Sequence, residues 1–288
     1  MVAGVTESSG QSMNEGSQGG DRITADSFVL VFRDRRKKWL VRPRDTPKLH
    51  THLGILDMTA LIGKGYGISV TTTLGDELTI LKPTVEDLIM KLARKTQVIY
   101  PKDLGLISLK LGVRAGSNVV ETGTGSGATT ALLAYLVQPG GMVYTYDINP
   151  EFQEVARKNL ERIGLSEHVT FRIADASLGF EESGMDAGVL DVGDPWDIVD
   201  SMRNALKPSA PLAAITPTTN QAERLVAKMK ESGFSAVETL EIMMRNLEAR
   251  VGMTRPSNHM IGHTAYLTFA RTLAREDTSA VVDSMEQQ

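Results

Sequence analysis

A glycine-rich turn is the segment of this chain best suited to hold a ligand. A short apolar run, 117–121, ends in the carboxylate of Glu121, and Gly123, Gly125 and Gly127 follow at alternate positions. A helix-forming run begins directly afterwards. Because glycine has no side chain, such a turn lets the backbone approach a bound molecule closely. The turn therefore predicts a ligand site between a strand and a helix.

A second carboxylate narrows the class of ligand. The next apolar run, 141–147, ends in Asp147. A carboxylate at the tip of the second strand of such a fold is placed to hold a ribose diol. The two segments together predict a ligand built on adenosine.

The spacing and charge of the turn favour one adenosine ligand over another. The dinucleotide fingerprint is G-x-G-x-x-G, with a helix N-terminus aimed at a pyrophosphate. Here the glycines run G-x-G-x-G, and Glu121 directly before them would repel a pyrophosphate. S-adenosylmethionine carries a sulfonium and an ammonium and no phosphate, so we predict it as the cofactor. A dinucleotide and an ordinary strand-to-helix turn are the alternatives.

Further aspartates follow the later strand-like runs. Asp191 continues the run 186–191 and should point toward the ligand edge, whereas Asp194 precedes Pro195 and is expected to cap a helix beginning near Trp196. Asp175 is expected at the adenine end of the ligand, although it could instead cap the residues after it. The cofactor-binding residues that we predict are Glu121, Gly123, Gly125, Ser126, Gly127, Asp147, Asp175, Ala176 and Asp191.

Alternating strand-like and helical runs place these residues on one edge of a sheet. This alternation implies a mainly parallel sheet with helices on both faces, and two late runs, 236–244 and 263–270, predict an antiparallel hairpin at its edge. Helical spacing also predicts a helix over 83–95 and another over 104–111. The remaining strands are expected at 117–121, 141–147, 169–174, 186–191 and 211–216, and the remaining helices at 127–138, 150–164, 196–206 and 218–232.

The rest of the chain divides by composition. Two hairpin patterns, 27–41 and 68–81, predict a small β domain. We expect a disordered tail at 1–21, the β domain at 22–82, the α/β domain at 83–275 and a polar tail at 276–288. No apolar run approaches the roughly 20 residues of a membrane span. The sequence has no cysteine, which excludes disulfides and fits a reducing cytoplasm. We expect no metal.

A basic run in the β domain is a candidate surface for nucleic acid. It is opposed by Asp34 and Asp45, and the formal net charge of the chain is −4. A solvated hairpin tip is the plain interpretation, and contact with a phosphate backbone is the functional one. The RNA-binding residues that we predict are Arg35, Arg36, Lys37, Lys38 and Arg42.

Several motifs in fixed order resemble one known family over roughly 27–271. The chain resembles the tRNA adenine-58 N1-methyltransferases in their archaeal form. The connector, the Pro-Trp turn and the last segment are the most specific parts of this resemblance. The matching segments are His50–Ile55, Leu61–Lys64, Val98–Asp103, Glu121–Gly127, Asp191–Trp196, Pro217–Gln221 and His263–Tyr266.

The resemblance implies a fold and a reaction. The fold would be a Rossmann-like class I methyltransferase domain with a small N-terminal β domain, usually in a homotetramer. The reaction would be methylation of the ring N1 of adenine 58 in the T-loop of tRNA, and adenine 57 stays open. Asp191 would be the catalytic aspartate, and we predict Tyr100 and His259 beside it. Gly193 departs from the proline of many relatives, which should loosen the turn.

Two other functions remain open from the sequence. A small-molecule methyltransferase of the corrin type has a similar core domain, and the N-terminal module argues against it. The family also includes non-catalytic tRNA-binding subunits that have lost the cofactor motif. This chain keeps Glu121 and Asp191.

Overall fold

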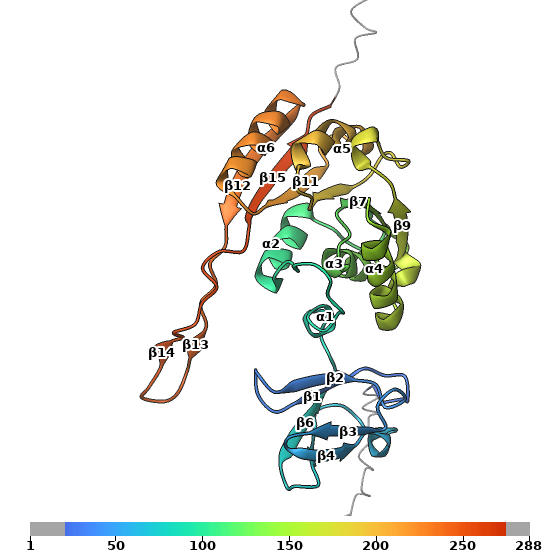
Figure 1. Ribbon diagram of the computed structural model, residues 1–288, viewed down its shortest axis with the longest axis vertical. Coiled ribbons are helices and arrows are strands. Elements are labelled where there is room, and N and C mark those ends of the chain that lie inside the picture. Colours follow the sequence, from blue (N-terminus) through green and yellow to red (C-terminus); the bar gives the residue numbers. More distant parts are fainter. Residues whose placement is uncertain (1–20, 275–288) are drawn as a thin grey trace, which may run out of the picture. The chain divides into compact units, whose positions relative to one another are not determined.

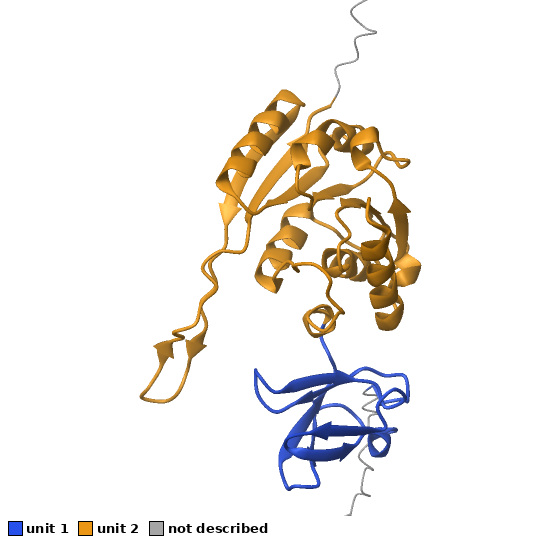
Figure 2. Cartoon of the chain, viewed as in Figure 1, with its two compact units in different colours: residues 1–84 blue, residues 85–288 orange. Residues whose placement is uncertain are grey.

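The computed structural model describes residues 21–274 as two compact units. The division falls between Thr84 and Val85, where the sequence places it between 82 and 83 (Figure 2). The expected tails lie outside the described residues, apart from Asp21.

The N-terminal unit is built from short antiparallel strands. A four-stranded sheet has the order β2-β1-β6-β5, and both hairpins expected from the sequence form within it. A further hairpin, β3 with β4, was not predicted from the sequence. The strands are β1 (Val29–Phe32), β2 (Lys38–Val41), β3 (Lys48–Thr51), β4 (Gly54–Asp57), β5 (Ile68–Thr71) and β6 (Glu77–Leu81).

The C-terminal unit contains a seven-stranded sheet with the order β12-β15-β11-β10-β7-β8-β9 (Figure 1). Five adjacent strands, from β11 to β9 in this order, pair in parallel, and β15 and β12 add an antiparallel hairpin at one edge. The predicted fold class is confirmed. The strands are β7 (Asn118–Thr122), β8 (Met142–Asp147), β9 (Val169–Ile173), β10 (Ala187–Leu190), β11 (Pro211–Thr216), β12 (Phe234–Glu241) and β15 (Tyr266–Thr272).

Helices cover both faces of this sheet. Successive strand residues alternate between faces, so Val119 packs into one hydrophobic cluster and Val120 into the other. The first cluster includes residues of α1, α2, α3 and α4, and the second includes residues of α5 and α6. The helices are α1 (Val85–Ile89), α2 (Pro101–Leu111), α3 (Ala128–Val137), α4 (Pro150–Ile163), α5 (Val199–Ala205) and α6 (Thr219–Glu231).

The helix expected over 83–95 is much shorter than predicted, because distant side chains take over its hydrogen bonds. Asn159 of α4 accepts from the backbone nitrogen of Ala93 at 3.0 Å and donates to its carbonyl at 2.9 Å. Ser126 Oγ accepts from the backbone nitrogen of Lys95 at 3.1 Å. The segment after α1 is thus drawn against the glycine turn instead of continuing the helix.

A long excursion leaves the sheet between β12 and β15. Its tip is a second, small hairpin, β13 (Leu247–Glu248) with β14 (Arg255–Pro256), and it extends away from the sheet (Figure 1). Glu241 ends β12 and Tyr266 begins β15, so these residues mark the base of the excursion.

Candidate active site

A cavity of about 590 Å³ lies at the carboxyl ends of the parallel strands. The order of the strands reverses between β7 and β10, and such a switch point is where open α/β sheets bind ligands. Among the described residues that line the cavity, none is a lysine or an arginine. The charged lining residues are Asp147, Asp175, Asp191, Asp194 and Asp197. This charge disfavours a pyrophosphate and favours a cation.

Gly123 is the point at which three strand ends meet. Its backbone nitrogen donates to the carbonyl of Tyr146 at 2.8 Å, and the nitrogen of Asp191 donates to the carbonyl of Thr122 at 3.0 Å. Gly123 has a φ of +83°, and a Cβ atom built there would lie 1.8 Å from the carbonyl oxygen of Asp191. Glycine is therefore required at position 123, both to adopt the turn conformation and to let the end of β10 approach the turn closely.

We expect Gly123→Ala to lower stability by about 2–6 kcal/mol, since backbone strain and overpacking each cost about 1–3 kcal/mol. Displacement of the Asp191 backbone should also abolish cofactor binding. Gly116→Ala is the matched control, because Gly116 has the same φ of +83° and open space around it. Urea denaturation and cofactor titration of both variants test this. Equal destabilisation by the two substitutions would contradict the steric argument.

Glu121 lies beneath the turn and is fully buried. Its Oε2 accepts from Thr130 Oγ1 at 2.6 Å, and its Oε1 has no hydrogen-bond partner. Burial, more than the nearby charges of Asp191 and Asp147, raises the pKa of Glu121 to about 8. A buried carboxyl with an unpaired oxygen suits a site that receives a positive charge from its ligand.

Backbone contacts fix the two outer carboxylates of the cavity. Asp147 accepts from the nitrogen of Gly125 at 3.1 Å and from that of Asn149 at 2.9 Å. Asp175 accepts from the nitrogen of Ser177 at 2.9 Å, so it caps the following turn while it also lines the cavity. Ala176 lines the cavity beside it.

Asp191 lines the cavity directly after β10. Burial and, second, the charge of Asp147 raise the pKa of Asp191 to about 7. The expectation that Asp194 caps the next helix is wrong in detail. Asp194 holds the N-cap position of a short 3-10 helix, Pro195–Ile198, but its side chain makes no capping hydrogen bond and borders the cavity instead.

Ser126 shapes one wall of the cavity. Its Oγ accepts from the backbone nitrogens of Lys95 and Thr96, at 3.1 and 3.3 Å, and its side chain is almost fully buried. The segment Thr96–Ile99 thereby lines the cavity opposite the aspartates. Sequence reasoning assigned no ligand role to 96–99, and its polar start gave no signal for one.

Tyr100 and His259, which we predicted beside Asp191, do not line the cavity that contains Asp191. They meet in a second cavity of about 580 Å³ together with Met90, Met244 and Met260. Ile99 lines the first cavity and Tyr100 the second, so the two sites are adjacent along the connector. This second cavity also includes residues of the excursion between its base and its tip, which the sequence pattern could not place.

The predicted RNA-binding residues lie in the N-terminal unit. Arg35, Arg36 and Lys37 are exposed in the turn between β1 and β2, where Asp34 accepts from the backbone nitrogens of Arg36 and Lys37. Lys38 begins β2 and is half-buried. Outside that turn, Arg42 is half-buried, donates to Asp45 at 2.7 Å and lies 5.0 Å from the ring centre of Phe28.

Two other classes of site have no counterpart in the part of the chain that the structure describes. Residues 21–274 contain no group of three or more acidic, histidine or cysteine side chains arranged to hold a metal ion. No helix in this range is both long and apolar enough to span a membrane.

Comparisons with known proteins agree with this geometry. A family model described as the tRNA methyltransferase complex GCD14 subunit matches residues 78–254. A tRNA (adenine(57)-N(1)/adenine(58)-N(1))-methyltransferase TrmI of Methanocaldococcus jannaschii is 36% identical, over 85% of this chain and 95% of its own length.

Solved structures extend the similarity to three dimensions. The tRNA (m1A58) methyltransferase TrmI from Aquifex aeolicus is 32% identical with a TM-score of 0.77, covering 88% of this chain and 100% of its own. A structure described as a SAM-dependent O-methyltransferase from Thermotoga maritima is 38% identical with a TM-score of 0.83, covering 89% and 97%. The chain therefore belongs to the GCD14/TrmI family of tRNA methyltransferases.

Proposed function

We propose that this protein transfers a methyl group from S-adenosylmethionine to the ring N1 of adenine 58 in the T-loop of tRNA. The observation that carries the proposal is the cavity at the switch point, whose charged lining residues are all aspartates. A cofactor with a sulfonium, an ammonium and a ribose diol matches that lining. We infer the RNA substrate from relatives of this chain that are named as tRNA methyltransferases.

Different residues of the site would bind different parts of the cofactor. Asp147 would accept from the ribose hydroxyls, since backbone contacts already fix its orientation. Asp175 and Ala176 would border the adenine. Glu121 would act from beneath the glycine turn through its charge, and Gly125, Ser126 and Gly127 would shape the turn itself.

In this proposal Asp191 would act on the acceptor. When bound, S-adenosylmethionine supplies a methyl group activated by its sulfonium. The N1 atom lies on the Watson–Crick edge of adenine, so the base must leave its stack to be reached. Asp191 would accept from the exocyclic amine, which orients the ring and stabilises the positive charge of the product. Tyr100 and His259, in the adjacent cavity, would hold the RNA beside it.

Purified protein, unmodified tRNA and labelled S-adenosylmethionine test the proposal directly. We expect label in 1-methyladenosine at position 58, and a tRNA with guanosine at that position should receive none there. Mapping also shows whether adenine 57 is modified. Cofactor binding without transfer would favour a non-catalytic tRNA-binding subunit. Transfer to a corrin but not to tRNA would overturn the RNA substrate.

The basic turn of the N-terminal unit would contact the tRNA backbone. Arg36→Glu, alone or with Arg35→Glu, should weaken tRNA binding and reduce the slope of log K against log salt by about one for each lost phosphate contact. Lys64→Glu is the matched control, because it is exposed in the same unit but outside the turn. Equal salt slopes for the Arg36 and Lys64 variants would remove the turn from the interface.

The oligomeric state and the cellular location are proposals. We propose a homotetramer, which light scattering of the purified protein measures. A cytoplasmic location, which the absence of cysteine favours, stays a prediction.

A further inference from the structure

The turn that carries Asp191 has little internal support. Gly193 is exposed, lies outside the left-handed region of φ, and has open space where a side chain would lie. A glycine at this place leaves the backbone free to adopt several conformations. The backbone nitrogen of Asp191 is held by the carbonyl of Thr122 at 3.0 Å, so contacts from outside are needed for the turn that follows it.

Gln221 of α6 supplies such a contact. Its Nε2 donates to the carbonyl of Gly193 at 3.0 Å, and its Oε1 accepts from Thr218 Oγ1 at 2.8 Å. A carbonyl can only accept, so the amide nitrogen must face Gly193. The contact joins two segments that are 28 residues apart in the chain.

The same helix holds the far side of the turn. The guanidinium of Arg224 lies 4.0 Å from the ring centre of Trp196, in cation–π contact. Positions three apart on a helix share one face, so Gln221 and Arg224 reach the turn from the same side of α6. Trp196 is buried, so the end of the turn at Trp196 is held in place by packing.

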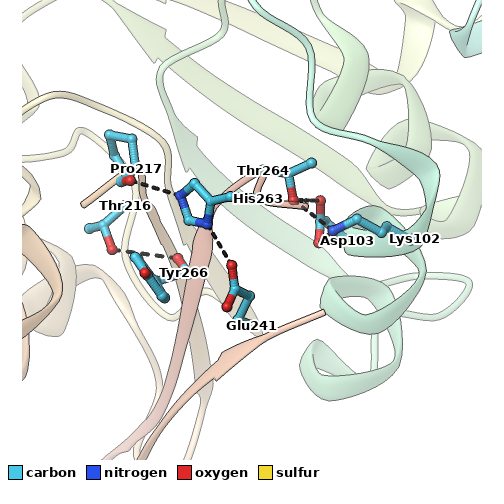
Figure 3. Close-up of polar contacts among 8 residues, drawn as sticks. All are labelled: Lys102, Asp103, Thr216, Pro217, Glu241, His263, Thr264 and Tyr266. Atoms are coloured by element: carbon cyan, nitrogen blue, oxygen red, sulfur yellow. Dashed lines mark hydrogen bonds and ion pairs between the residues drawn. The ribbon is translucent and has the colours of Figure 1, made fainter. Parts of the chain in front are cut away.

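His263 anchors the start of α6. Its Nε2 lies 2.9 Å from the carbonyl oxygen of Pro217, and its Nδ1 lies 2.6 Å from Glu241 Oε1 (Figure 3). Both partners are acceptors, so both ring nitrogens donate and the ring carries a positive charge. Pro217 directly precedes Thr218, the residue that caps α6.

The groups around His263 are all tied down. Tyr266 packs against its ring at 4.8 Å between centres. Thr264, the residue after His263, donates to Asp103 at 2.8 Å and accepts from Lys102 at 2.6 Å. These two contacts fix the N-terminus of α2 close to His263 (Figure 3). Glu241, Lys102 and Asp103 are the charged groups around it.

We propose that Gln221 is a positioning residue for Asp191, and that the charged ring of His263 fixes the helix from which Gln221 acts. This inference rests on the proposed function. The path runs from Glu241 and His263 through Pro217 and α6 to the carbonyl of Gly193. This series of contacts would restrict the turn at Gly193, where a glycine alone leaves the backbone free to move.

Gln221→Met tests the contact, because it keeps the length of the side chain and removes the donor. We expect kcat for tRNA methylation to fall about 10–100-fold, since a misplacement of about 1 Å can cost that much. The KM for the cofactor should change less than threefold. Glu223→Gln, exposed on the same helix, is the matched control and should leave both constants unchanged.

Two further measurements separate positioning from general damage. Hydrogen exchange of residues 190–196, measured without tRNA, should be faster in Gln221→Met than in the wild type. Adding Gly193→Ala, which restricts the turn, should restore part of the lost kcat. Wild-type kcat and unchanged exchange in Gln221→Met would overturn the proposal. An inactive wild-type protein would instead contradict the proposed function.

A double-mutant cycle tests the role of His263. His263→Ala and Gln221→Met should together cost less than the product of their separate effects on kcat, because they interrupt one path. Wild-type activity should also decline at alkaline pH as the ring loses its charge, and His263→Ala should lack this decline. Fully multiplicative effects with an unchanged alkaline decline would exclude His263 from the path.

Discussion

Replacing Asp191 by asparagine should lower the rate of methyl transfer about 10²–10³-fold, a loss typical for removal of one charge-stabilising group from an active site. Asparagine keeps the size of the side chain and removes its charge. Cofactor binding should persist, because Asp147, Glu121 and the glycine turn stay in place. Single-turnover transfer and cofactor titration of the variant measure the two quantities separately.

The pH dependence of the wild type gives an independent check on Asp191. Its pKa is raised to about 7, so the carboxyl is protonated and inactive below that pH. We expect kcat/KM for the cofactor, which reports the free enzyme, to rise with pH between about 7 and 8, where Asp191 and then Glu121 lose their protons, and Asp191→Asn should lack the part of this rise near 7. A bound cation favours the carboxylate, so the corresponding limb in kcat should lie at lower pH.

The control for Asp191 is its neighbour across the turn. Asp194→Asn removes a carboxylate from the same cavity but from the position before Pro195. It should cost less than tenfold in kcat. If Asp194→Asn were as damaging as Asp191→Asn, net charge in the cavity rather than a specific contact would be responsible.

Replacing Glu121 by glutamine should have opposite effects on binding and on stability. Loss of the charge should weaken cofactor binding about 10–100-fold, since interactions with a charged group contribute about 1.5–3 kcal/mol. The same change should make the cofactor-free protein more stable at alkaline pH. An unpaired buried carboxylate is costly, and glutamine has no charge to bury.

The sign of the stability effect follows from the pKa of Glu121. Its ordinary value is 4.5 and folding raises it to about 8, so the folded state holds the proton more tightly. The resulting stabilisation is complete below pH 4.5 and is lost as the pH rises through 8. Cofactor-free wild type should therefore lose stability over this range, and Glu121→Gln should lose less.

Thermal unfolding from pH 5 to 9, with and without cofactor, checks this prediction. Calorimetry at pH 7 in buffers of different ionisation enthalpy should show that wild type releases protons on binding the cofactor, and that Glu121→Gln releases fewer. Glu161→Gln, on the exposed face of α4, is the control. Identical pH profiles for the Glu121 variant and wild type would show that the buried carboxyl does not titrate in this range.

The sequence predicted the elements whose signals are local. Alternating strand-like and helical runs gave the parallel sheet, two late strand-like runs gave the edge hairpin, and strand pairs with turn residues gave both predicted N-terminal hairpins. The carboxylates Asp147, Asp175 and Asp191 could be placed on one edge, because the carboxyl ends of parallel strands share an edge. Each of these inferences needed only residues close together in the chain.

The features that were missed depend on contacts between distant segments. The helix over 83–95 stops early because Asn159, far along the chain, binds the backbone of Ala93. The second cavity forms only where the connector meets the part of the excursion between its base and its tip. Gln221 ends one of the segments that resemble the family, but the sequence assigned it no role, because its partner, the carbonyl of Gly193, lies in a distant segment.

The contact of Gly123 with the Asp191 carbonyl has a consequence for how such an enzyme can change over time. In the proposed function, one residue belongs to the segment that would bind the donor and the other to the segment that would act on the acceptor. They touch through backbone atoms, so no exchange of neighbouring side chains can relieve a clash between them. A change in the backbone of either segment would therefore require a matching change in the other, so the two segments are expected to change together.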